Sequence, residues 1–147
     1  MKPGELFSIV NTGVLPAWVL LAALPRWKWT QVFAAAVTPA ILALVYVVVL
    51  VTHWGETDGN FNSLEGVKSL FANDWALLAG WIHYLAFDLF TGCWVVRDAR
   101  RLEISHVLIV PCLVLTLMFG PAGLLSYLIL RFVLRRKQAR LAEWDRI

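Results

Sequence analysis

Long runs of apolar residues, separated by short polar links, dominate the pattern of the chain. A helix needs roughly 20 apolar residues to cross a hydrocarbon core of ~30 Å, and four of the runs reach about that length. We therefore predict an all-α, polytopic membrane bundle of about four transmembrane helices. The expected helices cover residues 5–24, 31–53, 74–96 and 104–134.

The one sizeable polar connection, residues 54–73, contains a second kind of pattern. Residues 62–73 place apolar side chains on one helical face and charged side chains on the other. Asn62 is the expected N-cap, with Glu65 three positions later as in a capping box. We predict a short amphipathic helix lying at the membrane interface, which we favour over a helix that docks a partner.

The last apolar run is longer than one bilayer crossing, and Pro111 and Gly120-Pro121 interrupt it. One interpretation is a single kinked helix; the other is a helix broken at Gly120-Pro121 whose second half is re-entrant. Charge favours the second, because a further or re-entrant crossing gathers every Lys and Arg except Lys2 and Lys68 on one side. Length favours the first, because two passes would have only about 15 residues each. We predict the single kinked helix, followed by a basic tail over 135–147.

Composition supports a membrane protein. The 147 residues are 60% hydrophobic and only 16% charged, whereas soluble domains carry about 25% charged residues. The length suits one membrane domain spanning residues 1–147, and membrane lipids are its expected neighbours. The net charge of +3 comes from basic residues at the ends of apolar runs, which is typical of membrane topology, and no nucleic-acid partner is expected. Cys93 and Cys112 lie in apolar segments and are predicted to be buried thiols.

The middle of the third predicted helix carries the candidate chemistry. His83, Tyr84 and Asp88 lie near the expected bilayer centre, where an ionisable carboxyl normally faces a protein interior or a wet cavity. A carboxyl removed from water favours its neutral form, which can donate a proton. We therefore take Asp88, His83 and Tyr84 as candidate catalytic residues, with His83 as a base or second acid. The alternative is that Asp88 only bonds another helix and stabilises the bundle.

A tight basic turn at Arg97–Arg101 is expected to pack the third and fourth helices antiparallel. Counting from that turn places Asp88 level with Leu113, one helical turn from Cys112 and Thr116. Helical spacing gives Tyr84, Asp88 and Thr91 one stripe, and gives His83 and several aromatic residues another. Asn11, in the first helix, is expected mainly to form an interhelical hydrogen bond. The candidate substrate-binding residues are Trp81, Phe87, Thr91, Trp94, Cys112, Thr116 and Asn11.

Metal and nucleophile motifs are not visible. His53, His83 and His106 lie at different expected depths, and no helix carries a ligand pair at i, i+3 or i, i+4 spacing. There is no HEXXH motif, no histidine box, and no Ser-His-Asp or Cys-His set. We predict no metal site and no cofactor.

Several longer motifs carry a family resemblance. They are WxHYxxFDLFxG at Trp81–Gly92, the pair Arg97-Asp98, PCLxLT at Pro111–Thr116, and GPxGLLxY at Gly120–Tyr127 followed by Arg131. Through them the chain resembles the abscisic-acid-deficient-4-like membrane family. LFSIVNT and SLEGVKSLF fit more loosely, so the resemblance covers most of residues 6–131.

The resemblance implies a reaction class. Plant members of that family are required for neoxanthin formation from violaxanthin in plastid membranes. Such an isomerisation of an epoxide to an allenic alcohol needs an acid and a base and no redox cofactor. The implied ligand is a carotenoid or another isoprenoid lipid. Because a plastid transit peptide is not visible, the chain is expected to be a multi-pass protein of a bacterial plasma membrane.

Two functional hypotheses follow, and the sequence leaves open whether the protein is an enzyme. The first is an isomerase-like membrane enzyme that modifies a carotenoid or other isoprenoid. The second is a non-catalytic subunit that binds pigment or lipid, or scaffolds a membrane complex. A transporter or channel is less favoured, because the chain shows no inverted repeat and few polar residues to line a path. Oligomerisation is compatible with both hypotheses.

Overall fold

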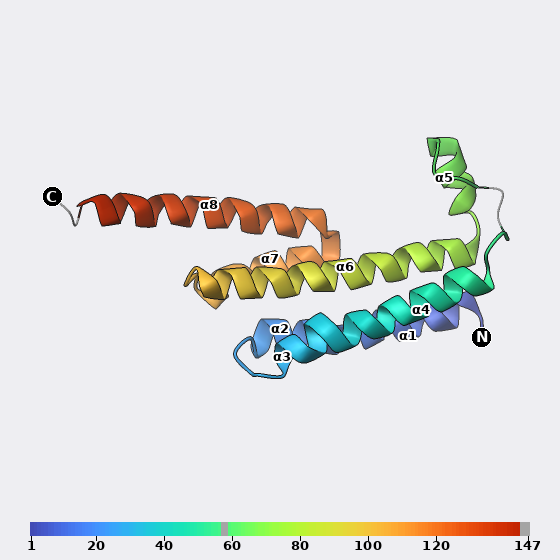
Figure 1. Ribbon diagram of the computed structural model, residues 1–147, viewed down its shortest axis with the longest axis horizontal. Coiled ribbons are helices and arrows are strands. Elements are labelled where there is room, and N and C mark those ends of the chain that lie inside the picture. The colour runs from blue at the N-terminus through green and yellow to red at the C-terminus, as the bar shows by residue number, and fades with distance from the viewer. Residues whose placement is uncertain (57–58, 145–147) are drawn as a thin grey trace.

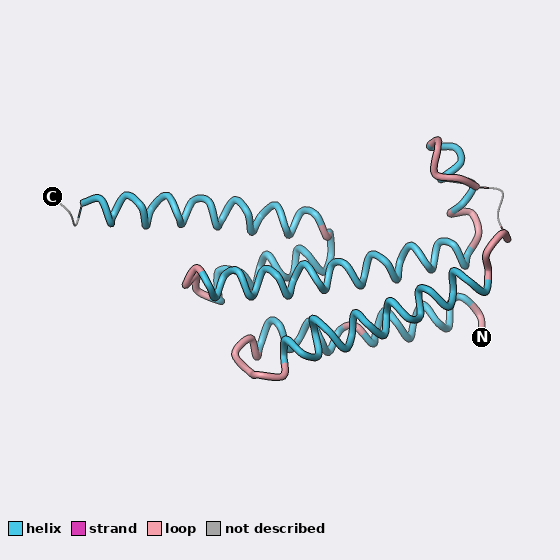
Figure 2. Tube along the Cα trace, viewed as in Figure 1, coloured by secondary structure: helices cyan, strands magenta, loops and turns pink. Residues whose placement is uncertain are grey.

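The computed structural model describes residues 1–56 and 59–144, and within these ranges all regular secondary structure is helical, which confirms the all-α fold class. The longer helices lie side by side along one direction (Figures 1 and 2). In chain order the elements are α1 (Pro3–Gly13), α2 (Leu15–Ala23), α3 (Thr30–Val32), the π-helix η1 (Phe33–Val37), α4 (Thr38–Thr52), α5 (Leu64–Leu70), α6 (Asp74–Arg101), α7 (His106–Phe119) and α8 (Pro121–Trp144).

Three helical segments in the described part of the chain are long and apolar enough to cross a membrane. They are Pro3–Ala23, Thr30–Thr52 and Asp74–Arg101, whereas α7 is apolar but shorter. The sequence predicted about four spanning helices; three are found within the described residues, and the predicted fourth segment is divided between α7 and α8. The physical reason lies in the 104–134 segment, which does not form one helix.

Proline shapes the first two long segments. The first segment breaks at Val14, and Pro16 begins the new helix within its first turn. The second segment forms the π-helical turn η1 just before Pro39. Proline cannot donate a backbone hydrogen bond, so the preceding turn must adjust. Both long segments therefore depart from regular α-helix geometry next to a proline.

Helix α5 is shorter than the predicted 62–73 helix and has a different cap. The Ser63 hydroxyl accepts a hydrogen bond from the Gly66 nitrogen at 3.0 Å, so Ser63 is the N-cap and the prediction of Asn62 was wrong. Asn62 instead donates its own backbone N–H to Asn60 Oδ1. This bond belongs to the turn before the helix, which explains why the helix starts later. In Figure 1, α5 stands off at one end of the bundle.

Helix α6 is the centre of the fold. It lies between the α1–α4 layer and the α7–α8 pair (Figure 1) and supplies the largest share of the core, including Ile82, Leu89 and Val95. The Asn73 side chain caps its start by accepting from the Trp75 and Ala76 nitrogens. Its predicted end at Val96 was wrong, because the helix continues to Arg101.

The chain reverses direction at Gly120. Helices α7 and α8 lie side by side and antiparallel in Figure 1, so the single kinked helix over 104–134 was wrong and the broken alternative is what the structure contains. Gly120 has a φ of 45°, a conformation that glycine adopts readily. Pro121 then starts α8, where its missing N–H has no consequence. The two helices approach closely, because a Cβ on Gly123 would overlap the Thr116 backbone.

Candidate functional site

The Asp88 carboxyl lies against the α7–α8 reversal. A Cβ on Gly120 would come within 2.8 Å of Asp88 Oδ1 and 3.2 Å of Tyr84 Cε2. Both a positive φ and this close approach therefore require glycine at position 120. The carboxyl is held in the middle of the longest helix, beside the first turn of α8. The positive end of the α8 dipole thus faces a group that can carry negative charge.

The carboxyl is polar and only partly satisfied. Its Oδ2 atom is enclosed and accepts no hydrogen bond from the described residues. The Tyr84 side chain lies close enough to interact with it electrostatically. Burying a polar atom without a partner costs free energy and is rare in folded proteins, and a catalytic role is one explanation for it. Tyr84 and Asp88, placed on one stripe by the sequence, are thus brought together.

A chain of contacts extends this site toward α1. The Trp81 Nε1 donates to Asn11 Oδ1 at 3.2 Å, which confirms the interhelical hydrogen bond expected for Asn11. The Trp81 and Tyr84 rings lie 5.2 Å apart between centroids. Residues 81, 84 and 88 follow the i, i+3, i+7 spacing of one helical face. The contacts along this face of α6 therefore connect Asn11 in α1 with the reversal at Gly120.

His83 and Phe87 face another neighbour. Their rings stack at 4.5 Å between centroids, and the His83 ring also lies 6.0 Å from Tyr46 of α4. Both side chains are exposed on the outside of the bundle. The contacts of Asp88, in contrast, are to Tyr84 and the α7–α8 reversal. The described structure therefore does not bring His83 and Asp88 together.

The remaining predicted substrate-binding residues contact other residues of the helical bundle. Thr116 is fully buried and its Oγ1 donates to the Cys112 carbonyl at 2.7 Å, and the glycine that Asp88 approaches is Gly120 rather than a residue level with Leu113. The reason is the position of the turn: α6 continues through Arg101 and the reversal falls over residues 102–105. Asp88 is therefore level with Gly120. Trp94 packs edge-on to the Tyr127 ring, and Thr91 is half-buried.

A second polar cluster was missed by the sequence analysis. Asp98 is 8% exposed, and its Oδ2 accepts a hydrogen bond from the Tyr127 hydroxyl at 2.7 Å. The same oxygen forms an ion pair with Arg131 Nε at 2.9 Å. Arg101 adds a longer, exposed contact of 3.4 Å to Oδ1. All these residues except Arg101 lie in the motifs quoted above, but only the reversal at Gly120 places α8 beside Asp98.

Metal-ligating side chains do not gather in the described part of the chain, where no group of three or more His, Cys, Asp and Glu is found. Cys93 and Cys112 are buried free thiols. His106 contacts a backbone carbonyl, that of Ala22, at 2.9 Å. His53 pairs with Glu56 at 2.9 Å. The three histidines therefore have separate local partners.

The long apolar helices and the carboxyl held at a helix reversal define a helical membrane protein with a polar site inside an apolar bundle. A family model described as ABA DEFICIENT 4-like matches residues 5–127, and the chain belongs to this family. The resemblance seen in the motifs is thereby confirmed. Neither the curated proteins nor the solved structures include a match to the chain. The matched range contains Asp88, Asp98, Gly120 and Tyr127.

Proposed function

We propose that this protein isomerises a carotenoid or another isoprenoid lipid by proton transfer, with Asp88 as the catalytic residue. The observation that carries the proposal is the placement of the Asp88 carboxyl. It lies in the middle of a membrane-length helix, against Gly120, with one oxygen enclosed and unpartnered among the described residues. Family membership supports the substrate class through the reaction that the resemblance implies.

An epoxide-to-allenic-alcohol isomerisation moves one proton from carbon to oxygen and changes no redox state. In our proposal the neutral Asp88 carboxyl donates its proton to the epoxide oxygen as the C–O bond breaks. The resulting carboxylate then takes the vinylic proton from the substrate carbon, which forms the allene and restores the acid. Tyr84 positions the carboxyl. His83 contacts α4, so we assign it no proton transfer and place it beside the apolar part of the substrate.

Replacing Asp88 by asparagine is expected to abolish isomerisation, with a loss on the order of 100-fold or more, because the amide cannot exchange the proton. The measurement is isoprenoid and pigment profiling of a deletion strain that carries the wild type or the variant. Asp74→Asn is the matched control, because Asp74 is exposed in the first turn of the same helix. Equal product from Asp88→Asn and wild type, at equal protein level in the membrane, would sink acid catalysis by Asp88.

A second candidate function is a non-catalytic pigment- or lipid-binding subunit. The observation that favours it is the exposed aromatic face of α6, where Phe87 is 61% exposed and Phe90 is 50% exposed. Such a face offers apolar area to a rigid polyene. This function predicts that Asp88→Asn keeps bound pigment and complements the deletion strain, whereas Phe87→Ser with Phe90→Ser does neither.

We also propose a topology of three crossings followed by a re-entrant α7–α8 hairpin. The reversal at Gly120 returns α8 to the end of the bundle where α6 finishes (Figure 1). Among the residues whose side chains the structure describes, that end then carries every Lys and Arg except Lys2 and Lys68. The positive-inside rule places it at the cytoplasmic face and puts the N-terminus on the opposite side. In the sequence, the distribution of basic residues favoured a re-entrant segment, whereas the length was too short for two crossings. A re-entrant hairpin satisfies both, because neither of its helices has to cross the whole membrane.

We expect the two termini to lie on opposite sides of the membrane, and fusions that report the side of each terminus can measure this. A fluorescent protein at the C-terminus should mature in the cytoplasm, and an N-terminal cysteine tag should react with an impermeant thiol reagent in intact cells. A cysteine placed at Gly55 should also react, because α4, which ends at Thr52, finishes at the same end of the bundle as the N-terminus in Figure 1. Both termini on the same side would contradict the re-entrant hairpin.

A further inference from the structure

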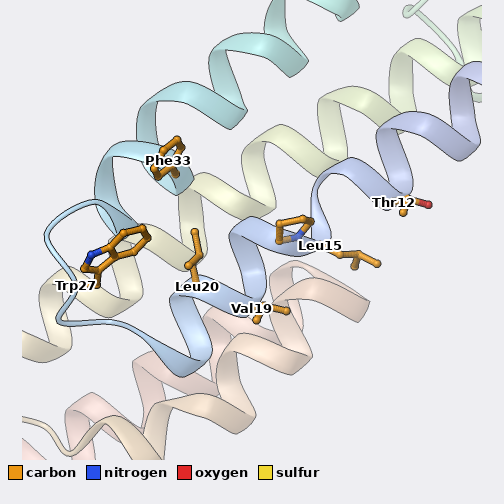
Figure 3. A pocket seen from close by; sticks show the side chains of 7 residues that line it. Thr12, Leu15, Val19, Leu20, Trp27 and Phe33 are labelled. Atoms are coloured by element: carbon orange, nitrogen blue, oxygen red, sulfur yellow. The ribbon is translucent and has the colours of Figure 1, made fainter.

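An apolar groove lies on the outside of the bundle, largely along α2. It has a volume of about 670 Å³ and is open along its length. Thr12 lies at one end, Trp27 and Phe33 at the other, and Leu15, Val19 and Leu20 form much of its wall (Figure 3). None of the side chains that line it comes from α6. It is therefore distinct from the site described above.

The groove lies where two helices depart from regular geometry. One wall follows the α1–α2 break at Val14, and the other includes Phe33, the first residue of the π-helix η1. The Trp27 ring stacks on the Phe33 ring at 6.4 Å between centroids, and the two rings line one end of the groove. Single π-helical turns inside α-helices are frequent at functional sites.

The loop at the Trp27 end of the groove carries two cations. Arg26 and Lys28 flank Trp27 and are both exposed. The loop is held in place, because Thr30 Oγ1 donates to the Leu24 carbonyl at 2.6 Å and Arg100 donates to the Pro25 carbonyl at 3.4 Å. The backbone of this loop thus holds two basic residues next to Trp27 at one end of the groove, where the Lys28 Nζ lies 5.5 Å from the Trp29 ring centroid.

We propose that this groove binds one anionic glycerophospholipid. An acyl chain lies along Leu15, Val19 and Leu20, and the phosphate of the headgroup meets Arg26 and Lys28. Charge complementarity selects an anionic headgroup, because each basic residue near an anionic lipid surface contributes roughly a five-fold change in binding. The indoles of Trp27 and Trp29 suit the same depth, since Trp is enriched where apolar chains meet the headgroups.

The experiment counts lipids retained by the purified full-length protein in native mass spectrometry. The probes are phosphatidylglycerol and phosphatidylcholine with identical acyl chains. The wild type is expected to retain one phosphatidylglycerol with a preference on the order of tenfold over phosphatidylcholine. Arg26→Gln with Lys28→Gln should remove this preference without unfolding the protein, because both side chains are exposed. Lys2→Gln with Lys68→Gln is the matched control and should keep it.

A second pair of variants tests the groove itself. Val19→Trp fills the groove and should lower retention of both phospholipids, whereas Val51→Trp should not, because Val51 is 68% exposed on α4 and does not line the groove. Equal retention of the two phospholipids by the wild type would overturn the proposal. So would equal losses from Val19→Trp and Val51→Trp, or an isoprenoid pigment that occupies the groove in place of phospholipid. Asp88→Asn should retain the phospholipid, so this test is independent of the proposed catalysis.

Discussion

Replacing Gly123 by alanine is expected to destabilise the protein by at least about 2 kcal/mol, the range typical of overpacking a tight core. A Cβ at this position would overlap the backbone nitrogen and the Oγ1 atom of Thr116 in α7. Backbone cannot rotate away as a flexible side chain can, and Thr116 is itself fixed by its hydrogen bond to the Cys112 carbonyl. The two helices must therefore separate. The measurement is the thermal unfolding midpoint of the purified protein in detergent, followed by circular dichroism.

Gly13→Ala is the matched control. Gly13 ends α1, and a Cβ there would meet nothing within 4 Å. Alanine in a helix is favoured over glycine by up to about 1 kcal/mol, so this variant should unfold at the wild-type temperature or slightly above it. A midpoint for Gly123→Ala equal to that of Gly13→Ala would show that α7 and α8 do not pack as closely as the structure has them.

The effect of Gly123→Ala should reach the candidate site. The packing of α8 on α7 fixes the reversal at Gly120, and Gly120 is the residue that Asp88 approaches most closely among the glycines of the chain. Separation of the two helices would open this contact and expose the Asp88 carboxyl. We therefore expect the variant to lose isomerisation even where part of the protein remains folded.

Several local features of the helices follow from signals between residues that are close in the sequence. Asn73 precedes an apolar run and caps α6, because its side chain can accept from the first free backbone N–H groups. Pro16 removes a backbone donor, which predicts the break before α2. Asp88 and Tyr84 share a face because helical spacing alone decides it. These features depend on residues within a few positions of one another, so they can be predicted from the sequence alone.

The reversal at Gly120 depends on residues far apart in the chain, and the sequence prediction failed there. A glycine followed by proline is compatible with a kink and with a full reversal. What selects the reversal is the contact of Gly123 with Thr116 and the ion pair between Asp98 and Arg131. Charges normally end a membrane helix, so the basic run at Arg97–Arg101 suggested a turn. Asp98 is instead buried and paired, and α6 continues past it.

The pair Asp98 and Arg131 gives the second prediction of large effect. Asp98→Asn is expected to lower the free energy of unfolding by about 3 kcal/mol, because it leaves the Arg131 guanidinium, 27% exposed, without its carboxylate. Arg131→Gln should cost a similar amount, since it leaves Asp98 buried with only Tyr127 and the distant Arg101. The measurement is chemical unfolding of each variant in the same detergent.

The double variant decides whether the two residues act as a pair. Asp98→Asn with Arg131→Gln removes both charges together, so we expect a cost well below the sum of the two single variants. Glu103→Gln is the control, because Glu103 is exposed at the same end of α6 and a surface substitution should stay within about 0.5 kcal/mol of wild type. Additive costs would contradict the ion pair. Because this pair anchors α8 and Asp88 does not, Asp98→Asn should lose stability first, whereas Asp88→Asn should lose isomerisation in a folded protein.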